Sequence, residues 1–175
     1  MSLGSCFARH IGRALKKNDF NFLGYEPAYI DCYYFAAPPD DLGYGLFSAR
    51  YGNLYTVRQL RQLFLRAFGS FLPVEEFRGD DGSWFDPFRP TIEPFGYHSR
   101  LEAVNMRAAH LAAVRRLFED SELMIFTMGL TEAWRDKRDG AVYPMCPGTV
   151  AGVFDANKHE FINFSYKKSW KTWKG

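Results

Sequence analysis

The sequence GSCFA at residues 4–8 lies where the chain turns into a predicted helix. This places Ser5 at the helix N-terminus, where backbone N–H groups lack intrahelical partners and the macrodipole favours negative charge. A hydroxyl at this point can attack an acyl carbon while neighbouring amides bind the resulting oxyanion. Serine is also a common N-cap residue. The stretch therefore allows two interpretations of Ser5, a nucleophile and a structural cap.

Helix signals recur three times along the chain. Periodic apolar residues predict a helix over residues 6–17 that is closed by residues 18–19. Two capping boxes, which begin at Thr56 and Ser99, predict helices over residues 57–68 and 100–120. The faces expected to be buried are Phe7, Ile11 and Leu15; Val57, Leu60, Phe64 and Phe68; and Leu101, Val104, Ala108, Leu111, Val114 and Phe118.

Strand signals follow the third helix. The apolar run LMIFTM at residues 123–128 is typical of a strand buried on both faces, as in parallel α/β sheets. It leads into GLTEAW at residues 129–134, and ligands of open α/β sheets bind beyond the carboxyl ends of strands. Residues 141–164 predict a hairpin, and residues 24–45 a long aromatic loop. This order predicts a layered α/β domain.

Composition excludes several classes of protein. The 175 residues are 47% hydrophobic and 24% charged, which fits one soluble globular domain. A net charge of +2 and the lack of a dense basic patch argue against a nucleic-acid partner. The mixed basic and aromatic residues 167–174 are interpreted as a frayed terminus. Since no apolar run approaches membrane length, we expect no membrane span.

The cysteines and histidines show no ligand-like spacing. Cys6, Cys32 and Cys146 form no CxxC pair, which indicates a reducing compartment, and we expect a cytoplasmic protein without a disulfide framework. The four histidines form no HExxH pattern. We therefore expect neither a metal site nor a cofactor.

The motifs GSCFA and GLTEAW together resemble the two signature motifs of the GSCFA-domain proteins, which belong to the SGNH/GDSL hydrolase superfamily. The resemblance extends from Ser5 to about Phe164. It implies a three-layer, flavodoxin-like α/β domain with a mostly parallel sheet, here spanning residues 1–175.

The resemblance also implies roles for individual residues. Ser5 occupies the position of the nucleophile, and its own N–H would contribute to the oxyanion hole. Gly52 is the candidate for the second glycine of that hole, with Gly43 and Gly45 as neighbouring alternatives. Thr131 occupies the place of an asparagine that donates to the oxyanion. Glu132 is a candidate for orienting a partner or binding a substrate hydroxyl.

The sequence departs from the superfamily pattern in two ways. Thr131 offers one rotating hydroxyl where an amide is expected. No histidine lies in an Asp-x-x-His block, so we expect the chain to be the N-terminal portion of a longer domain. Among the histidines present, His98 is the best placed to assist Ser5, and Cys6 is a rival nucleophile, because a thiolate is favoured at a helix N-terminus.

Three functions follow as hypotheses. The first is a serine esterase or acyl-transfer enzyme acting on a small or carbohydrate ester, inactive as this piece because serine without a base is a poor nucleophile. The second is a non-catalytic module that binds a carbohydrate or another polar ligand on the same fold. The third is a polypeptide that completes its sheet with another chain, since strand edges would otherwise stay unpaired.

Overall fold

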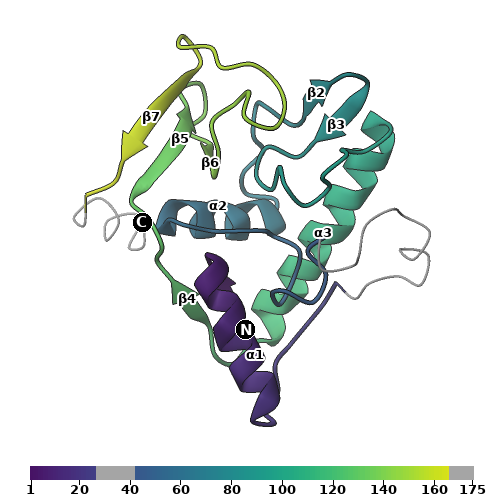
Figure 1. Cartoon of the computed structure of the whole chain (residues 1–175), viewed down its shortest axis with the longest axis vertical. Helices are drawn as coiled ribbons and strands as arrows, with labels where there is room; N and C mark the ends of the chain where they lie inside the picture. Colours follow the sequence, from purple (N-terminus) through teal and green to yellow (C-terminus); the bar gives the residue numbers. More distant parts are fainter. Residues whose placement is uncertain (27–41, 166–175) are drawn as a thin grey trace.

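The computed structural model describes residues 1–26 and 42–165. Most of the predicted aromatic loop, Cys32 and the basic terminus at residues 167–174 lie outside the described residues. Figure 1 shows the three-stranded sheet β6-β5-β7 on one side of helix α2, and helix α1 with strand β4 on the other. The protein is thus a mixed α/β structure.

All three predicted helices are confirmed. They are α1 (Cys6–Lys17), α2 (Val57–Ala67) and α3 (Arg100–Asp120). The capping box of α2 is complete, because the Gln59 N–H donates to Thr56 Oγ1 at 3.2 Å and Gln59 Oε1 accepts the Thr56 N–H at 3.0 Å. At α3, Ser99 accepts from the Glu102 N–H, but the Glu102 carboxylate accepts from the N–H of His98. The local hydrogen-bond signals therefore located these helix starts.

The predicted buried faces are confirmed only in part. That of α3 is confirmed at Val114, Leu111 and Phe118. That of α2 is confirmed at Leu60 but not at Phe64, which is 41% exposed. Phe7 is 63% exposed, and α1 instead buries Ala8 and Gly12. Leu101 of α3 is 70% exposed, whereas His110 is buried. The small side chains of Ala8 and Gly12 let α1 pack closely against the rest of the fold. In α3, the buried His110 contacts the Glu26 carboxylate, and apolar periodicity cannot predict such a polar contact.

The strands form three small sheets. Strand β1 (Ser2–Gly4) pairs in parallel with β4 (Ile125–Thr127), with Leu3 opposite Phe126. Strands β2 (Arg78–Asp80) and β3 (Ser83–Phe85) form an antiparallel hairpin. The third sheet is antiparallel, with β5 (Glu132–Asp136) between β6 (Val142–Tyr143) and β7 (His159–Asn163).

These pairings correct the predicted sheet. Within the described residues only β1 and β4 are parallel, so the expected mostly parallel sheet is wrong here. Strand β4 is half-buried, not buried on both faces. The predicted hairpin at residues 141–164 is also different, because β6 and β7 each pair with β5 and not with each other. The hydrophobic pattern of the sequence predicted where strands occur, but it did not predict which strands pair with each other.

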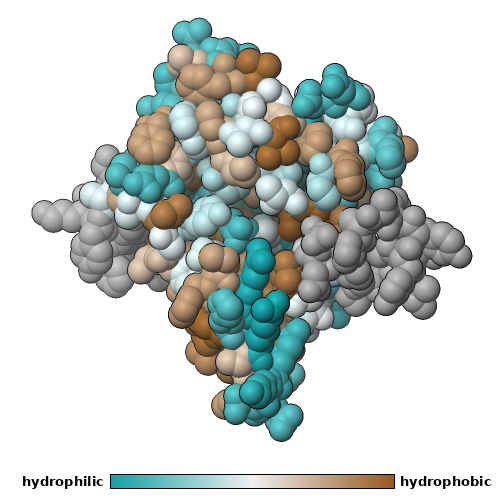
Figure 2. Space-filling view, in the orientation of Figure 1, coloured by the Kyte–Doolittle hydropathy of each residue, from teal (hydrophilic) through white to brown (hydrophobic). Residues whose placement is uncertain are grey.

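The main core lies where α1, α2 and α3 meet the parallel pair. Its buried residues are Leu3, Ala8, Phe47, Ala49, Tyr51, Leu54, Leu60, Leu63, Val114 and Leu117. Hydrophilic residues cover the lower end of the molecule, where α1 ends (Figure 2). Among the described residues, none of the helices is both long and apolar enough to cross a membrane.

Candidate functional site

Three glycine-marked loops meet beside Ser5. The N–H of Leu54 donates to the carbonyl of Gly4 at 2.9 Å. The N–H groups of Gly129 and Leu130 both donate to the carbonyl of Tyr55, at 3.1 and 3.2 Å. Because β1 and β4 are parallel, the loops after their carboxyl ends emerge at the same edge. Backbone hydrogen bonds therefore join three loops that are far apart in the sequence.

Two of these glycines are required by close packing. Gly4 has a φ of +140°, and a Cβ atom there would overlap the hydroxyl of Thr127 and lie 2.7 Å from its carbonyl oxygen. A Cβ atom on Gly129 would lie 3.1 Å from both Cβ and Oγ of Ser5. Gly4 thus permits the close approach of β1 to β4, and Gly129 brings backbone against the candidate nucleophile.

Ser5 occupies the N-cap position of α1 without acting as a hydrogen-bonding cap. Its backbone is extended, with φ −81° and ψ −170°, and its side chain makes no capping hydrogen bond. The residue is half-buried. Ser5 therefore lacks the side-chain hydrogen bond to the helix backbone that the structural-cap interpretation requires. Its hydroxyl does not bond to the first turn of α1.

The predicted oxyanion-hole residues are arranged less simply. The N–H groups of Gly129 and Leu130 already bond to Tyr55, so they are occupied. A Cβ atom on Gly52, which has a φ of +71°, would contact Arg89 and Ile92 at 3.7 Å. Thr131 is exposed, and its carbonyl accepts the N–H of Phe164 at 2.8 Å. Within the described ranges, neither Gly52 nor Thr131 forms a hydrogen bond with Ser5.

Asn53 is a polar residue of this region that the sequence reasoning did not select. It lies between Gly52 and Leu54, in the loop that bonds to Gly4. Its Oδ1 atom is buried and has no hydrogen-bond partner within the described part of the chain. A buried carbonyl oxygen without a hydrogen-bond partner is costly, so this atom requires an explanation, whereas the Asn53 side chain does hydrogen-bond to Tyr55. The sequence feature that could have selected Asn53 is its position directly after Gly52, in the second of the glycine-marked loops.

Tyr55 and Cys6 complete the surroundings of the serine. Burial raises the pKa of Tyr55, and the nearby Cys6 thiol raises it further. A Cβ atom on Gly129 would also lie 3.5 Å from the Tyr55 ring. Cys6 is exposed and follows Ser5 directly. The tyrosine therefore remains protonated at neutral pH, and its hydroxyl can donate and accept hydrogen bonds.

The histidines are engaged elsewhere. His98 is exposed and precedes α3, beside β3, on the other side of α2 from α1 (Figure 1). The Nδ1 of His110 lies 2.7 Å from the Glu26 carboxylate, and His159 accepts the N–H of Asp155 at 3.2 Å. His10 lies against the ring of Phe7. Among the described residues no histidine forms a hydrogen bond with Ser5.

Glu132 begins β5, three residues after Gly129. It is exposed and pairs in register with Asn163. The structure therefore brings Gly129 to Ser5 but leaves Glu132 at the edge of the site, where a ligand could reach it.

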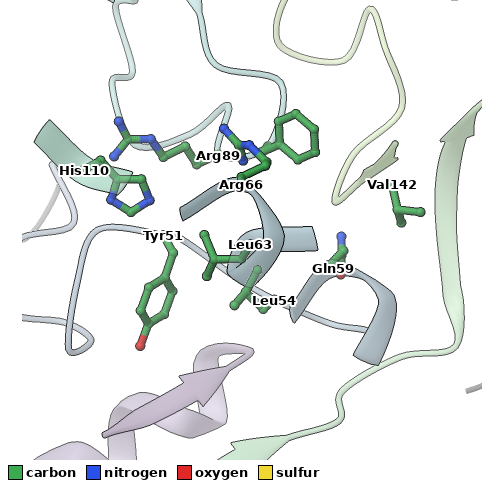
Figure 3. A pocket seen from close by; sticks show the side chains of 9 residues that line it. Tyr51, Leu54, Gln59, Leu63, Arg66, Arg89, His110 and Val142 are labelled. Carbon is green, nitrogen blue, oxygen red and sulfur yellow. The ribbon is translucent and has the colours of Figure 1, made fainter. Parts of the chain in front are cut away.

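A second polar region is the buried charged layer formed by Glu26, Arg66, Asp86, Arg89 and His110. Figure 3 shows Arg66, Arg89 and His110 on one side of α2, while the ring of Tyr51 points away from them, toward β1. The enclosed cavity beside them measures about 10 Å³, which is room for one water molecule. Gln59 Nε2 and Arg66 Nη2 have no hydrogen-bond partner among the described residues, although Arg66 Nη2 lies 3.7 Å from Asp86 Oδ2. This cavity can hydrate the layer but cannot hold a substrate.

One group of metal-ligand side chains occurs in the described residues. Atoms of Glu75, Asp136 and His159 lie within 4.8 Å of one another. They come from a loop, from β5 and from β7, so their spacing in the sequence gives no metal signature.

The fold and this site define an α/β protein with a serine between a strand and a helix, and the side chain of this serine does not cap the helix. The whole chain, residues 1–175, matches the GSCFA family, and the protein therefore belongs to that family. Neither a curated protein nor a solved structure matches it.

Proposed function

We propose that this chain carries the nucleophile of an SGNH-type serine esterase or acyl transferase that acts on a small or carbohydrate ester. The observation that carries the proposal is the uncommitted Ser5 hydroxyl, with Gly129 packed against it at the start of α1. A strand that ends in a nucleophile at a helix N-terminus places the reacting oxygen next to unpaired N–H groups.

The proposed reaction begins with attack of Ser5 Oγ on the ester carbonyl. The C–O bond to the serine forms as the carbonyl π electrons move onto oxygen, and the leaving alcohol then departs with a proton. The first N–H groups of α1 face the developing oxyanion. We assign the remaining donor to the Nδ2 group of Asn53, in place of Thr131, because Asn53 lies in the loop whose next residue, Leu54, donates to Gly4 beside Ser5.

Among the described residues no histidine forms a hydrogen bond with Ser5, so in this proposal the hydroxyl proton passes to solvent water. A serine hydroxyl is weakly nucleophilic without a neighbouring base. This chain is therefore proposed to acylate slowly and to release its acyl group more slowly still.

An acylation assay tests the proposal. Mixed with excess p-nitrophenyl acetate, the chain should release about one equivalent of nitrophenolate per protein molecule before turnover stalls. Ser5→Ala should abolish this release, Cys6→Ala should retain it, and Asn53→Ala should slow it by about a hundredfold, the cost of one oxyanion donor. Release that survives Ser5→Ala but is lost in Cys6→Ala would assign the chemistry to the thiol.

The second candidate is a binding module without catalysis, and the lack of a Ser5–histidine hydrogen bond in the described residues favours it. This function predicts stabilisation by a ligand at the glycine-loop site that persists in Ser5→Ala. A thermal-melt comparison of wild type and Ser5→Ala, each with and without glucose pentaacetate, separates the two candidates.

A further inference from the structure

A second cleft lies on the other side of α2 from Ser5. It is formed by residues 74–77, the start of α3, β3 of the β2–β3 hairpin and the sheet that contains β7. Its volume is about 520 Å³, within the range of small-molecule sites. Figure 2 shows hydrophilic and hydrophobic residues mixed over the upper half of the molecule, where these strands lie. The proposed esterase function does not involve this cleft.

The charged groups of the cleft are held in pairs. Arg138 Nε donates to Asp136 Oδ1 at 2.9 Å, and Arg78 Nη2 donates to Glu75 Oε2 at 2.8 Å. Lys158 lies 3.3 Å from Asp155, and Arg100 pairs with Glu76. The charged residues that line the cleft are Glu75, Glu76, Arg100, Arg138 and Lys158, and each of them is paired with an opposite charge. Each pair retains lone pairs or N–H groups for further hydrogen bonds. Such a wall favours neither an anion nor a cation.

The Glu75–Asp136–His159 group lies at this cleft but is poorly suited to a metal. His159 is 3% exposed, and burial lowers its pKa, so the ring is neutral at pH 7. Its Nδ1 accepts the N–H of Asp155, so the ring proton lies on Nε2, which has no partner. A metal needs a lone pair on the ligating nitrogen, and ligating histidines donate from the other one. The tautomer and the arginines on both carboxylates therefore disfavour a cation.

Trp84 is an aromatic wall of the cleft that is not engaged elsewhere. In the described part of the chain its ring makes no aromatic or cation–π contact, whereas Trp134 packs edge-on against Phe154 and Phe161. Trp84 is half-buried and lines the cleft, and the face of a tryptophan is an apolar platform with a polar edge. The C–H face of a sugar ring fits such a platform.

We propose that this cleft binds a neutral carbohydrate, with the sugar ring on Trp84 and its hydroxyls on the ion-paired side chains of Glu75, Glu76 and Arg138. Each hydroxyl donates one hydrogen bond and accepts others, so a wall of alternating carboxylates and cations satisfies both needs. Because the pairs are already formed, little side-chain ordering is required on binding.

The test is a titration of the full chain with cellobiose and with chitobiose, followed through the tryptophan indole N–H resonances. The Trp84 signal should shift in a saturable manner, with a Kd of about 1 mM, while the Trp134 signal stays fixed. Trp84→Ala should weaken binding by at least about tenfold. Glu76→Gln tests the wall without touching a buried residue, and it should weaken binding by about threefold. Ser5→Ala should bind as wild type does.

Parallel titrations with zinc chloride and with inorganic phosphate distinguish the other ligand classes. The proposal is overturned if neither disaccharide moves the Trp84 signal at about 50 mM, well above the expected Kd. It is equally overturned if zinc or phosphate shifts the signals of the cleft at lower concentrations than the sugars do. Loss of sugar binding in Ser5→Ala would place the ligand at the serine site instead.

Discussion

The serine site and the buried charged layer both border the Tyr51–Tyr55 segment and are built in different ways. At the serine site, backbone hydrogen bonds and two glycines hold the chain. The Ser5 side chain makes no capping hydrogen bond, and Asn53 Oδ1 has no hydrogen-bond partner among the described residues. In the charged layer, Asp86 Oδ2 receives Arg89 Nε at 3.2 Å and lies 3.7 Å from Arg66 Nη2. Both arginines are buried.

This difference distinguishes polar groups that stabilise the fold from polar groups that are available to a ligand. Burial alone would raise the pKa of Asp86, but Arg66 and Arg89 outweigh it and hold that pKa low. A charge paired in this way stabilises only the folded geometry. A polar group left unpaired on a rigid backbone remains available to a ligand. The two regions should therefore respond differently to substitution.

The largest effect is expected at the charged layer. Asp86→Asn removes the carboxylate that pairs with both Arg66 and Arg89 in the interior, which should cost about 3 to 5 kcal/mol of unfolding free energy. Urea denaturation measures this loss. The exposed pair of Arg115 and Glu119 is the matched control, and Glu119→Gln should cost less than about 0.5 kcal/mol. Equal effects of the two substitutions would refute the distinction.

Gly4→Ala should produce the next largest loss. The new Cβ would overlap Thr127 at a positive φ, and strain plus overpacking should cost about 2 to 4 kcal/mol. Gly24→Ala is the control, because a Cβ there meets nothing within 4 Å. The same denaturation experiment compares them, and an unchanged midpoint for Gly4→Ala would show that β1 and β4 do not approach closely.

Acid should weaken the charged layer through His110. Burial and then Arg89 lower its pKa despite the Glu26 and Asp86 carboxylates. The unfolded chain therefore binds the proton more readily than the folded chain, and stability falls as the pH drops below the ordinary histidine value of about 6.5. The loss should reach about 1 to 3 kcal/mol. Thermal melts across this range should show it, and His110→Gln should flatten the dependence above the carboxylate range.

The smallest effect on stability, with a clear effect on reactivity, is expected for Gly129→Ala. Its Cβ would press on Ser5 at 3.1 Å without meeting a buried charge, so stability should change by less than about 1 kcal/mol. Displacement of Oγ by a few tenths of an ångström should slow acylation by about tenfold. The nitrophenolate release assay measures this rate, and an unchanged rate would separate Gly129 from the site.

The sequence predicted those parts that depend on neighbouring residues. Thr56 and Gln59 lie three positions apart and form their capping box through local hydrogen bonds. The four residues from Thr56 to Gln59 were therefore sufficient to predict where the helix begins. The two signature motifs identified the family and the loops that meet at Ser5. The roles of Gly52, Thr131, Glu132 and His98 remain predictions.

The remaining features depend on distant partners. His110 interrupts the apolar face of α3 because Glu26, 84 residues earlier, receives its hydrogen bond. The pairing of both β6 and β7 with β5 likewise depends on three separated segments. Apolar periodicity reports how much of a face is buried, and it contains no information about which residue lies opposite.

The central claim is that Ser5 is a nucleophile in a site built by the glycine loops. The most direct measurement is mass-spectrometric mapping of the residue modified by a fluorophosphonate probe in the folded chain. The account predicts a single adduct on Ser5, formed more slowly in Gly129→Ala and absent from Ser5→Ala. An adduct on another residue, or none on chain shown to be folded, would contradict it.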